Sequence, residues 1–190
     1  MFFDELDSFL VSFKSRDLSY SERKTKAEEE EDIIDELLDL YLLAYFEGSK
    51  QAAEELMFNV DPSVPDAMKT IERPVAGKTY RDRVREYLNG DMGDTTGTPA
   101  EAIARVAETD AVRIFSEAGM TTAINAGATK KTWHTVGDNR VRDTHEPLDG
   151  ITVPLDANFY TWDDDMAQAP GQFEKASNNV NCRCWLTFSK

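Results

Sequence analysis

The sequence is poor in cysteine and histidine, two residues that many catalytic and metal centres use. It contains two cysteines and two histidines among 190 residues. It has no Gly-rich phosphate-binding loop, no Gly-x-Ser-x-Gly nucleophile elbow and no His-Glu-x-x-His zinc motif. The common signatures of nucleotide-binding proteins, α/β-hydrolases and zinc peptidases are therefore excluded.

Long apolar runs are also missing. No stretch approaches the roughly 18 apolar residues that a transmembrane helix requires, so we expect no membrane partner. The acidic N-terminus lacks the positively charged start of a signal peptide. Cys182 and Cys184 stand too close in the sequence for an unstrained disulfide, so we expect reduced thiols in a cytosolic setting.

Basic residues are outnumbered by acidic ones. The chain has 21 Lys and Arg against 36 Asp and Glu, a net charge of −15 and a pI near 4.5. Residues 1–60 alone carry a net charge of −10, and the remaining 130 residues carry −5. Such a surface repels a phosphate backbone, so we expect no appreciable binding to free duplex DNA. It favours basic partners instead.

The first sixty residues predict helices. Residues 2–13 have apolar side chains at helical spacing. A longer helix is predicted to begin at Ser21, to break at Gly48 and to resume over residues 51–58. Residues Ile33–Phe46 are apolar on more than one face, which predicts that this helix packs between neighbours or against another protein. We therefore expect a docking or self-association surface that includes Ile34, Leu38 and Leu42.

Two further helices are predicted between residues 61 and 127. The first spans Tyr80–Leu88. The second begins at Thr98-Pro99-Ala100-Glu101, which combines an N-cap, a proline in the first turn and a capping-box glutamate. We expect this helix to break or bend near Gly119 and to end near Gly127.

After Gly127 the hydrophobic period changes from 3.6 to 2. This change predicts strands over residues 131–136, 151–155 and 182–188, with a loop over most of residues 157–180. The expected fold is α+β, with a helical N-terminal part and a small, irregular β-containing C-terminal module.

Polar residues of several types lie between these strands: Asp138, Arg140, Arg142 and His145, followed by the turn signal Asp149-Gly150. We expect Asp138 to bond backbone amides, as aspartates in turns do. We expect Arg142 and His145 to be structural, with carboxylates or carbonyls as partners. The candidate carboxylates for Arg140 and Arg142 are Asp149, Glu108 and Asp110.

The predicted strand at residues 182–188 places Cys182 and Cys184 on one face, among apolar residues. We expect buried, reduced thiols without metal. An alternative is a zinc site formed by both thiols and His145, with or without His134. A further alternative is an enzyme that uses a thiol nucleophile beside His145, or a nuclease metal held by His134, Asp138 and His145. Burial raises the pKa of a thiol and so disfavours the nucleophile.

The order of these residues forms one pattern over about residues 100–188. It comprises a helix with an arginine and a Glu-Thr pair, a tryptophan strand, a D-x-R-x-R-x-x-H turn, an L-D-G step, a V-P-L-D strand, a phenylalanine, a Pro-Gly loop and a terminal N-C-R-C. The residues are Arg105, Glu108-Thr109, Trp133, Asp138-x-Arg140-x-Arg142-x-x-His145, Leu148-Asp149-Gly150, Val153-Pro154-Leu155-Asp156, Phe159, Pro170-Gly171 and Asn181-Cys182-Arg183-Cys184. In this order they resemble the carboxy-terminal module of the Mu F-like family of phage minor head proteins.

The resemblance assigns residues 98–190 to a minor head module. It does not reach residues 1–97, which we expect to form a helical extension used for docking. It implies a low-copy virion component that associates with the portal or the inner capsid, assists head assembly and can leave with the DNA. The expected partners are the portal protein or the major capsid protein. The expected location is the virion, and the host cytoplasm during assembly. The resemblance implies no enzymatic activity and no cofactor, and since the chain ends at Lys190 we expect no fused toxin domain of the kind that several relatives carry.

Overall fold

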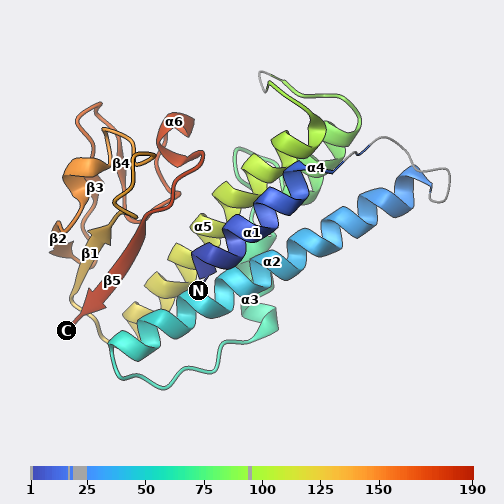
Figure 1. The fold of residues 1–190 in the computed structure, drawn as a ribbon. Helices are drawn as coiled ribbons and strands as arrows, with labels where there is room; N and C mark the ends of the chain where they lie inside the picture. Colours follow the sequence, from blue (N-terminus) through green and yellow to red (C-terminus); the bar gives the residue numbers. More distant parts are fainter. Residues whose placement is uncertain (1, 17, 19–24, 94–95) are drawn as a thin grey trace.

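The computed structural model describes residues 2–16, 18, 25–93 and 96–190. A helical body and a small β-containing module lie against each other (Figure 1), which confirms the α+β class. The helices of the body are α1 (Phe2–Lys14), α2 (Lys26–Glu55), α3 (Val64–Ile71), α4 (Tyr80–Leu88) and α5 (Pro99–Asn125). Among the described residues, no helix combines the length and the hydropathy needed to cross a membrane.

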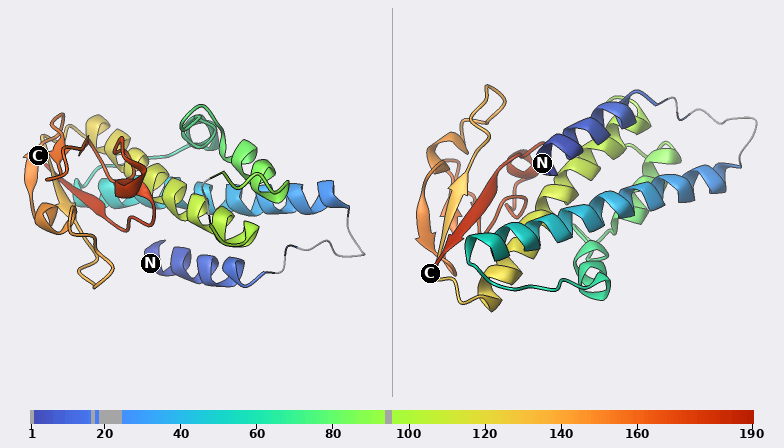
Figure 2. Two further views of the ribbon diagram at one scale, coloured as in Figure 1. Left: turned by 90° about the horizontal axis from the view of Figure 1, so that it is seen from above. Right: turned by 60° about the horizontal axis from the view of Figure 1, so that its bottom comes forward.

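Helices α2 and α5 form the centre of the body. They run side by side in the same direction, and α1 covers them in the opposite direction (Figures 1 and 2). Both begin with a capping box, Thr25 with Glu28 and Thr98 with Glu101. Each box satisfies backbone amides that would otherwise lack partners at a helix start. The predicted start at Ser21 lies outside the described residues.

Gly48 is a contact point between these helices and not a break. Helix α2 continues through it, so the predicted break is wrong. A Cβ atom built at Gly48 would lie 2.1 Å from the carbonyl oxygen of Phe115 in α5. Helix α5 is likewise continuous through Gly119, where a Cβ would lie 3.3 Å from the carbonyl oxygen of Gly48. The two backbones approach too closely for a side chain at Gly48, and they leave little room for one at Gly119.

The apolar stripe of α2 faces the other helices of the same chain. Ile34, Leu37 and Tyr41 are fully buried in a core that α1, α3, α4 and α5 complete. Leu38 and Leu42 are half-buried against that core. The prediction that this helix packs between neighbours is confirmed. Ile34 is wrong as a docking residue, because its side chain is already enclosed by the body.

The module contains one antiparallel sheet and one hairpin. The sheet has the order β2-β1-β5, with strands β1 (Lys130–His134), β2 (Thr152–Pro154) and β5 (Trp185–Ser189). The hairpin pairs β3 (Phe159–Tyr160) with β4 (Met166–Ala167), and the short helices are η1 (Glu146–Leu148) and α6 (Ala176–Asn179). The strand predicted from residue 182 begins at Trp185, because the preceding segment turns out of α6. The predicted alternation of buried residues nevertheless extends back to Cys182.

Body and module are in contact through α1, α2 and α5, and the end of α2 bonds directly to β5. The Gln51 side chain donates to the carbonyl oxygen of Leu186 at 3.0 Å, and the Phe188 amide donates to the Glu55 carboxylate at 2.8 Å. The apolar residues of α5 up to Ala118 lie in one core with α1, α2, α3 and α4. The expected boundary between residues 97 and 98 lies just before α5. Helix α5 therefore falls on the module side of this boundary in the sequence, although it packs into the core of the helical body.

Candidate functional site

Arg142 ties the loop after β1 to the segment before β5. Its guanidinium donates to the carbonyl oxygen of Asn178 at 2.7 Å and to that of Val180. The predicted partners of Arg142 were carboxylates or carbonyls, and its partners in the structure are carbonyls. Pairing with Asp110 is wrong, because that carboxylate is buried beside Arg83 in the helical body.

Asp138 makes the second link between the same two segments. Its two carboxylate oxygens accept hydrogen bonds from Arg183, both at 2.7 Å. Asp138 also accepts from the Arg140 amide at 3.0 Å, which confirms the predicted bond to a turn amide. These hydrogen bonds, that from Arg183 first, lower the pKa of Asp138. The Arg140 side chain is exposed and lies 4.0 Å from Asp138, so it adds little to the link.

Asp149 and Gly150 close the turn before β2, as predicted. The Asp149 carboxylate accepts from the amide and the hydroxyl of Thr135, at 2.7 and 3.2 Å. Gly150 has a φ of +75°, which favours glycine, and its amide donates to the carbonyl oxygen of Trp133 at 2.8 Å. Trp133 itself is fully buried and makes an edge contact with the ring of Phe159. The turn thus fixes the loop that leads to His145 against the core of the module.

His145 is held rigidly at the start of η1. Its amide donates to the carbonyl oxygen of Arg142 at 2.8 Å, and its own carbonyl oxygen accepts from the Leu148 amide at 2.9 Å. The imidazole is 1% exposed. It stacks on Phe173, with ring centroids 5.1 Å apart, and meets Trp133 edge-on at 5.5 Å. The ring orientation is therefore set by packing on both sides.

The Asn-Cys-Arg-Cys segment turns both thiols towards that imidazole. Asn181 has a φ of +57°, a conformation that asparagine tolerates better than most residues. The turn is closed by a hydrogen bond of 3.1 Å from the Cys182 amide to the carbonyl oxygen of Asn179. After the turn the chain is extended, so Cys182 and Cys184 point inwards while Arg183 reaches Asp138.

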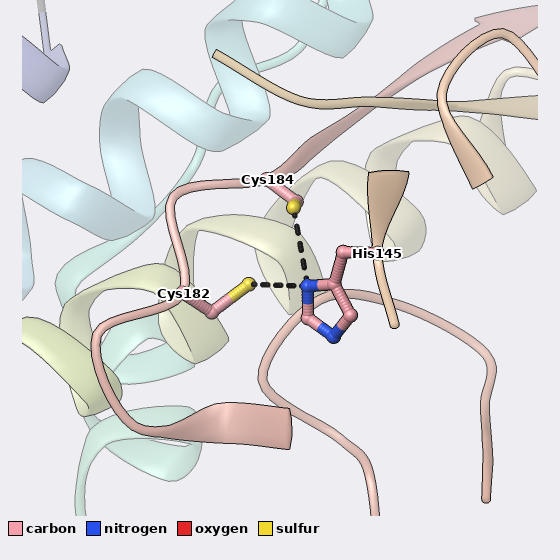
Figure 3. A group of neighbouring side chains, drawn as sticks. All are labelled: His145, Cys182 and Cys184. Carbon is pink, nitrogen blue, oxygen red and sulfur yellow. Dashed lines mark hydrogen bonds between the residues drawn. The ribbon is translucent and has the colours of Figure 1, made fainter. Parts of the chain in front are cut away.

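His145, Cys182 and Cys184 form a buried cluster, shown in Figure 3. Nδ1 of His145 lies 3.5 Å from Sγ of Cys184 and 3.7 Å from Sγ of Cys182. The three ligand atoms are all within 4.8 Å of one another, and the thiols are 2% and 3% exposed. Nε2 of His145 is buried and has no hydrogen-bond partner. The cluster borders a cavity of about 10 Å³, which is room for one water molecule.

The two thiols influence each other's ionisation. A hydrogen bond from Cys184 and a second contact with His145 lower the pKa of Cys182. The same interaction with Cys182, together with burial, raises the pKa of Cys184 far above its usual range. The cluster can bind a borderline-soft cation, for which thiolate and imidazole are suitable ligands. Its cavity has no room for an organic substrate beside the thiols.

The other histidine lies elsewhere. Nε2 of His134 is 2.8 Å from the Thr187 hydroxyl, and its ring stacks on Trp185. Among the described residues the groups able to hold a metal contain neither His134 nor Asp138. The alternatives of a Cys2His2 site with His134 and of a nuclease site with His134 and Asp138 are therefore wrong, because β1 directs His134 to the opposite side of its strand from Trp133.

Sequence reasoning missed two polar features of the module. The Asp165 carboxylate accepts from the amides of Met166, Glu174 and Lys175 and from the side chain of Asn178, at 2.9 to 3.1 Å. No periodic signal marks this residue. Lys131 lies in the strand predicted from residue 131, but its spacing does not reveal that it is 0% exposed and that its ammonium has no hydrogen-bond partner. Burial lowers the pKa of Lys131 to about 8.

A second, larger cleft lies next to the cluster. Its volume is about 490 Å³, and it is lined by α1, α5 and the two linked segments of the module. Its charged residues are of both signs: Asp7, Lys14, Glu108, Arg140, Arg142 and Arg183. Burial raises the pKa of Glu108 within this cleft. Glu108 thus lines the same cleft as Arg140 and Arg142, as predicted. Arg142, however, donates its hydrogen bonds to the carbonyl oxygens of Asn178 and Val180 and not to Glu108.

A family match and one of two similar proteins point to the same family. The family described as Phage Mu protein F like protein matches residues 66–187. The chain is 26% identical over 178 residues to the minor head protein GP7 of Bacillus phage SPP1, a match covering 80% of this chain and 58% of that protein. It is 29% identical over 145 residues to the NAD(+)–arginine ADP-ribosyltransferase EFV of Enterococcus faecalis, covering 62% of this chain and 30% of that protein. The chain thus spans 30 to 58% of the length of these relatives. No solved structure matches.

Proposed function

The chain belongs to the Phage Mu protein F like family of phage minor head proteins, and on that premise we propose that it is a low-copy virion component located at the portal or on the inner face of the capsid. We propose that it assists head assembly and leaves the head with the DNA. The observation that carries the proposal is the family match over residues 66–187, which takes in helices α4 and α5 and all but the end of the β-containing module. The match to the SPP1 minor head protein extends over 80% of the chain and so includes part of the remaining helical region.

The charge of the chain supports a protein partner in the head. A net charge of −15 disfavours direct packing on DNA and favours a basic surface on another head protein. The portal protein or the major capsid protein is the partner that we propose. The same charge keeps the chain soluble in the host cytoplasm before it enters the virion.

The hairpin of β3 and β4 offers a better docking surface than helix α2. Tyr160, Trp162 and Met166 are 67%, 69% and 44% exposed. Trp162 is held in place by a hydrogen bond of 3.2 Å from its indole to the carbonyl oxygen of Asp143. Exposed aromatic side chains on a rigid support are typical of protein interfaces. Leu38 and Leu42 remain a second candidate surface, but both are partly used by the core of the body.

The location is tested on intact virions of the phage that encodes the chain. We expect purified heads to contain the protein at a few copies per portal, measured by quantitative mass spectrometry against the major capsid protein. We expect a Tyr160→Ala, Trp162→Ala double variant to be lost from heads while its melting temperature is unchanged. Met57→Ala is the matched control, since Met57 is 96% exposed on the helical body. Absence of the wild-type chain from heads would refute the proposal, and normal incorporation of the double variant would move docking to Leu38 and Leu42.

We propose no enzymatic activity for the chain. The ADP-ribosyltransferase relative shares 30% of its own length with this chain, so its named activity does not carry over. The alternative of a thiol enzyme gains no support from the cluster of His145, Cys182 and Cys184, because its sulfurs face a cavity of about 10 Å³. Transfer from labelled NAD to an arginine-containing acceptor should be absent with the purified chain, and measurable transfer would contradict this part of the proposal.

A further inference from the structure

We propose that Nδ1 of His145 and the sulfurs of Cys182 and Cys184 bind one zinc ion, and that this ion crosslinks the loop after β1 to the segment before β5. The site is separate from the proposed docking surface and does not depend on it. It reverses the expectation of metal-free thiols drawn from the sequence, because the structure places a histidine nitrogen at nearly the same distance from both sulfurs.

The two nitrogen-to-sulfur distances fit a tetrahedral site. Zinc binds sulfur at about 2.3 Å and histidine nitrogen at about 2.0–2.1 Å, so a tetrahedron separates nitrogen from sulfur by roughly 3.6 Å. The observed separations from Nδ1 are 3.5 Å to Cys184 and 3.7 Å to Cys182. A single imidazole nitrogen carries either one hydrogen or one lone pair and makes one hydrogen bond. Two sulfurs at nearly equal distances are therefore better explained by a shared cation than by hydrogen bonding.

The surroundings select the kind of cation. Two thiolates balance the charge of one divalent ion, so the site needs no carboxylate ligand. The cavity beside the cluster is lined by Arg140, Arg142 and Arg183 and by no carboxylate. Hard cations such as Mg²⁺ and Ca²⁺ require several oxygen ligands, and this set of one nitrogen and two sulfurs suits zinc. The cavity of about 10 Å³ leaves room for one water molecule as the fourth ligand.

The ligands are also positioned before any metal binds. The imidazole is clamped between Phe173 and Trp133, and Arg142 fixes the loop that carries it. The two thiols follow a turn closed by its own backbone hydrogen bond at Asn179. Rigid support of this kind raises metal affinity, because little conformational freedom is lost on binding.

The proposal is tested on the full chain, produced without an affinity tag and purified without chelator. We expect about one zinc ion per chain by elemental analysis, and roughly tenfold less in Cys184→Ser and His145→Ala. His134→Ala is the matched control and should keep its zinc, since that histidine bonds Thr187 instead.

A second measurement covers variants that fail to fold. Cobalt(II) added to the metal-free wild-type chain should give the visible d–d bands of a tetrahedral ion and a sulfur-to-cobalt charge-transfer band. Zinc should also slow modification of Cys182 and Cys184 by a thiol reagent under native conditions. A folded wild-type chain with no zinc and no tetrahedral cobalt spectrum would overturn the proposal, as would full zinc content in a folded Cys182→Ser, Cys184→Ser double variant.

Discussion

In the helical body, α2 and α5 meet through glycine, alanine and large apolar side chains, whereas the segments of the module are joined by arginine, aspartate and asparagine. Gly48 lies directly on the backbone of Phe115 in the body. Arg142 and Asp165 in the module each bind two or more backbone groups. The difference follows from the lengths of the elements.

Helices of 27 and 30 residues satisfy their own backbone hydrogen bonds, so the body needs only apolar packing between them. The strands of the module are two to five residues long, and much of its backbone has no ladder partner. Buried backbone groups must nevertheless be paired. Polar side chains supply that pairing, so the module depends on individual polar residues where the body depends mainly on apolar packing.

The largest effect should come from breaking the closest contact of the body. Gly48→Ala places a methyl group 2.1 Å from the carbonyl oxygen of Phe115, which must move together with its helix. We expect the free energy of unfolding to fall by about 3 kcal/mol or more, as for severe overpacking. Chemical denaturation measures this. Gly119→Ala is the matched change. We expect it to lower the free energy of unfolding by less, because the atoms nearest to the new methyl group lie at 3.3 Å. Equal losses at both glycines would show that the backbone contact is not decisive.

The next largest loss of stability should come from Arg142 and not from Arg140, although both lie in the same loop. Arg142→Ala removes hydrogen bonds to two carbonyl oxygens, and we expect a loss of about 2–3 kcal/mol, typical of charged hydrogen bonds at a partly buried site. Arg140→Ala should cost less than about 0.5 kcal/mol, because its side chain is exposed. Thermal melting of the two variants decides the matter. An Arg142→Ala chain that melts normally but is not incorporated into heads would reassign this residue to partner binding.

A smaller effect is expected where the module buries a charge. The pKa of Lys131 is about 8 in the folded chain and 10.5 when unfolded. Between pH 8 and pH 10.5 the unfolded chain binds more protons than the folded chain, so the free energy of unfolding rises with pH. Below pH 8 the ammonium is charged in both states, and its burial destabilises the folded chain by the full amount. We expect Lys131→Met to be more stable than wild type by about 2 kcal/mol at pH 7. This advantage should shrink as the pH approaches 10.5.

Denaturation of wild type and Lys131→Met at several pH values measures the difference. Lys130→Met is the control, since Lys130 is the exposed neighbour on the same strand. A difference between wild type and Lys131→Met that does not vary with pH would mean that the ammonium reaches solvent.

The smallest effect concerns DNA. Residues 1–60 carry a net charge of −10, and the basic residues of the module mostly face carbonyls or acids. We expect no binding of duplex DNA at physiological salt in an anisotropy titration, because few phosphates could be neutralised. Micromolar affinity with a steep salt dependence, lost in Arg140→Glu, would show that the cleft beside α1 acts as a phosphate site.

The two regions also differed in how far their sequence could be interpreted. Helical spacing and capping boxes located α4 and α5 to within a residue or two, because each helix is stabilised by contacts near in sequence. Gly48 was misread as a break, since its role depends on Phe115, which lies far along the chain. In the module the turn at Asp138 and the turn at Asp149-Gly150 were predicted from local chemistry. The bonds of Arg142, the burial of Lys131 and the hub at Asp165 depend on partners that spacing cannot reveal.

The hydrogen bonds between α2 and β5 affect how copies of the chain can meet. β5 forms one edge of its sheet, and an open edge invites a strand from another molecule. Here the carbonyl of Leu186 and the amide of Phe188 are already bonded to α2 of the same chain. That edge is closed to strand addition. A strand from another copy could pair with β5 only by displacing these two hydrogen bonds, so self-association through β5 is disfavoured.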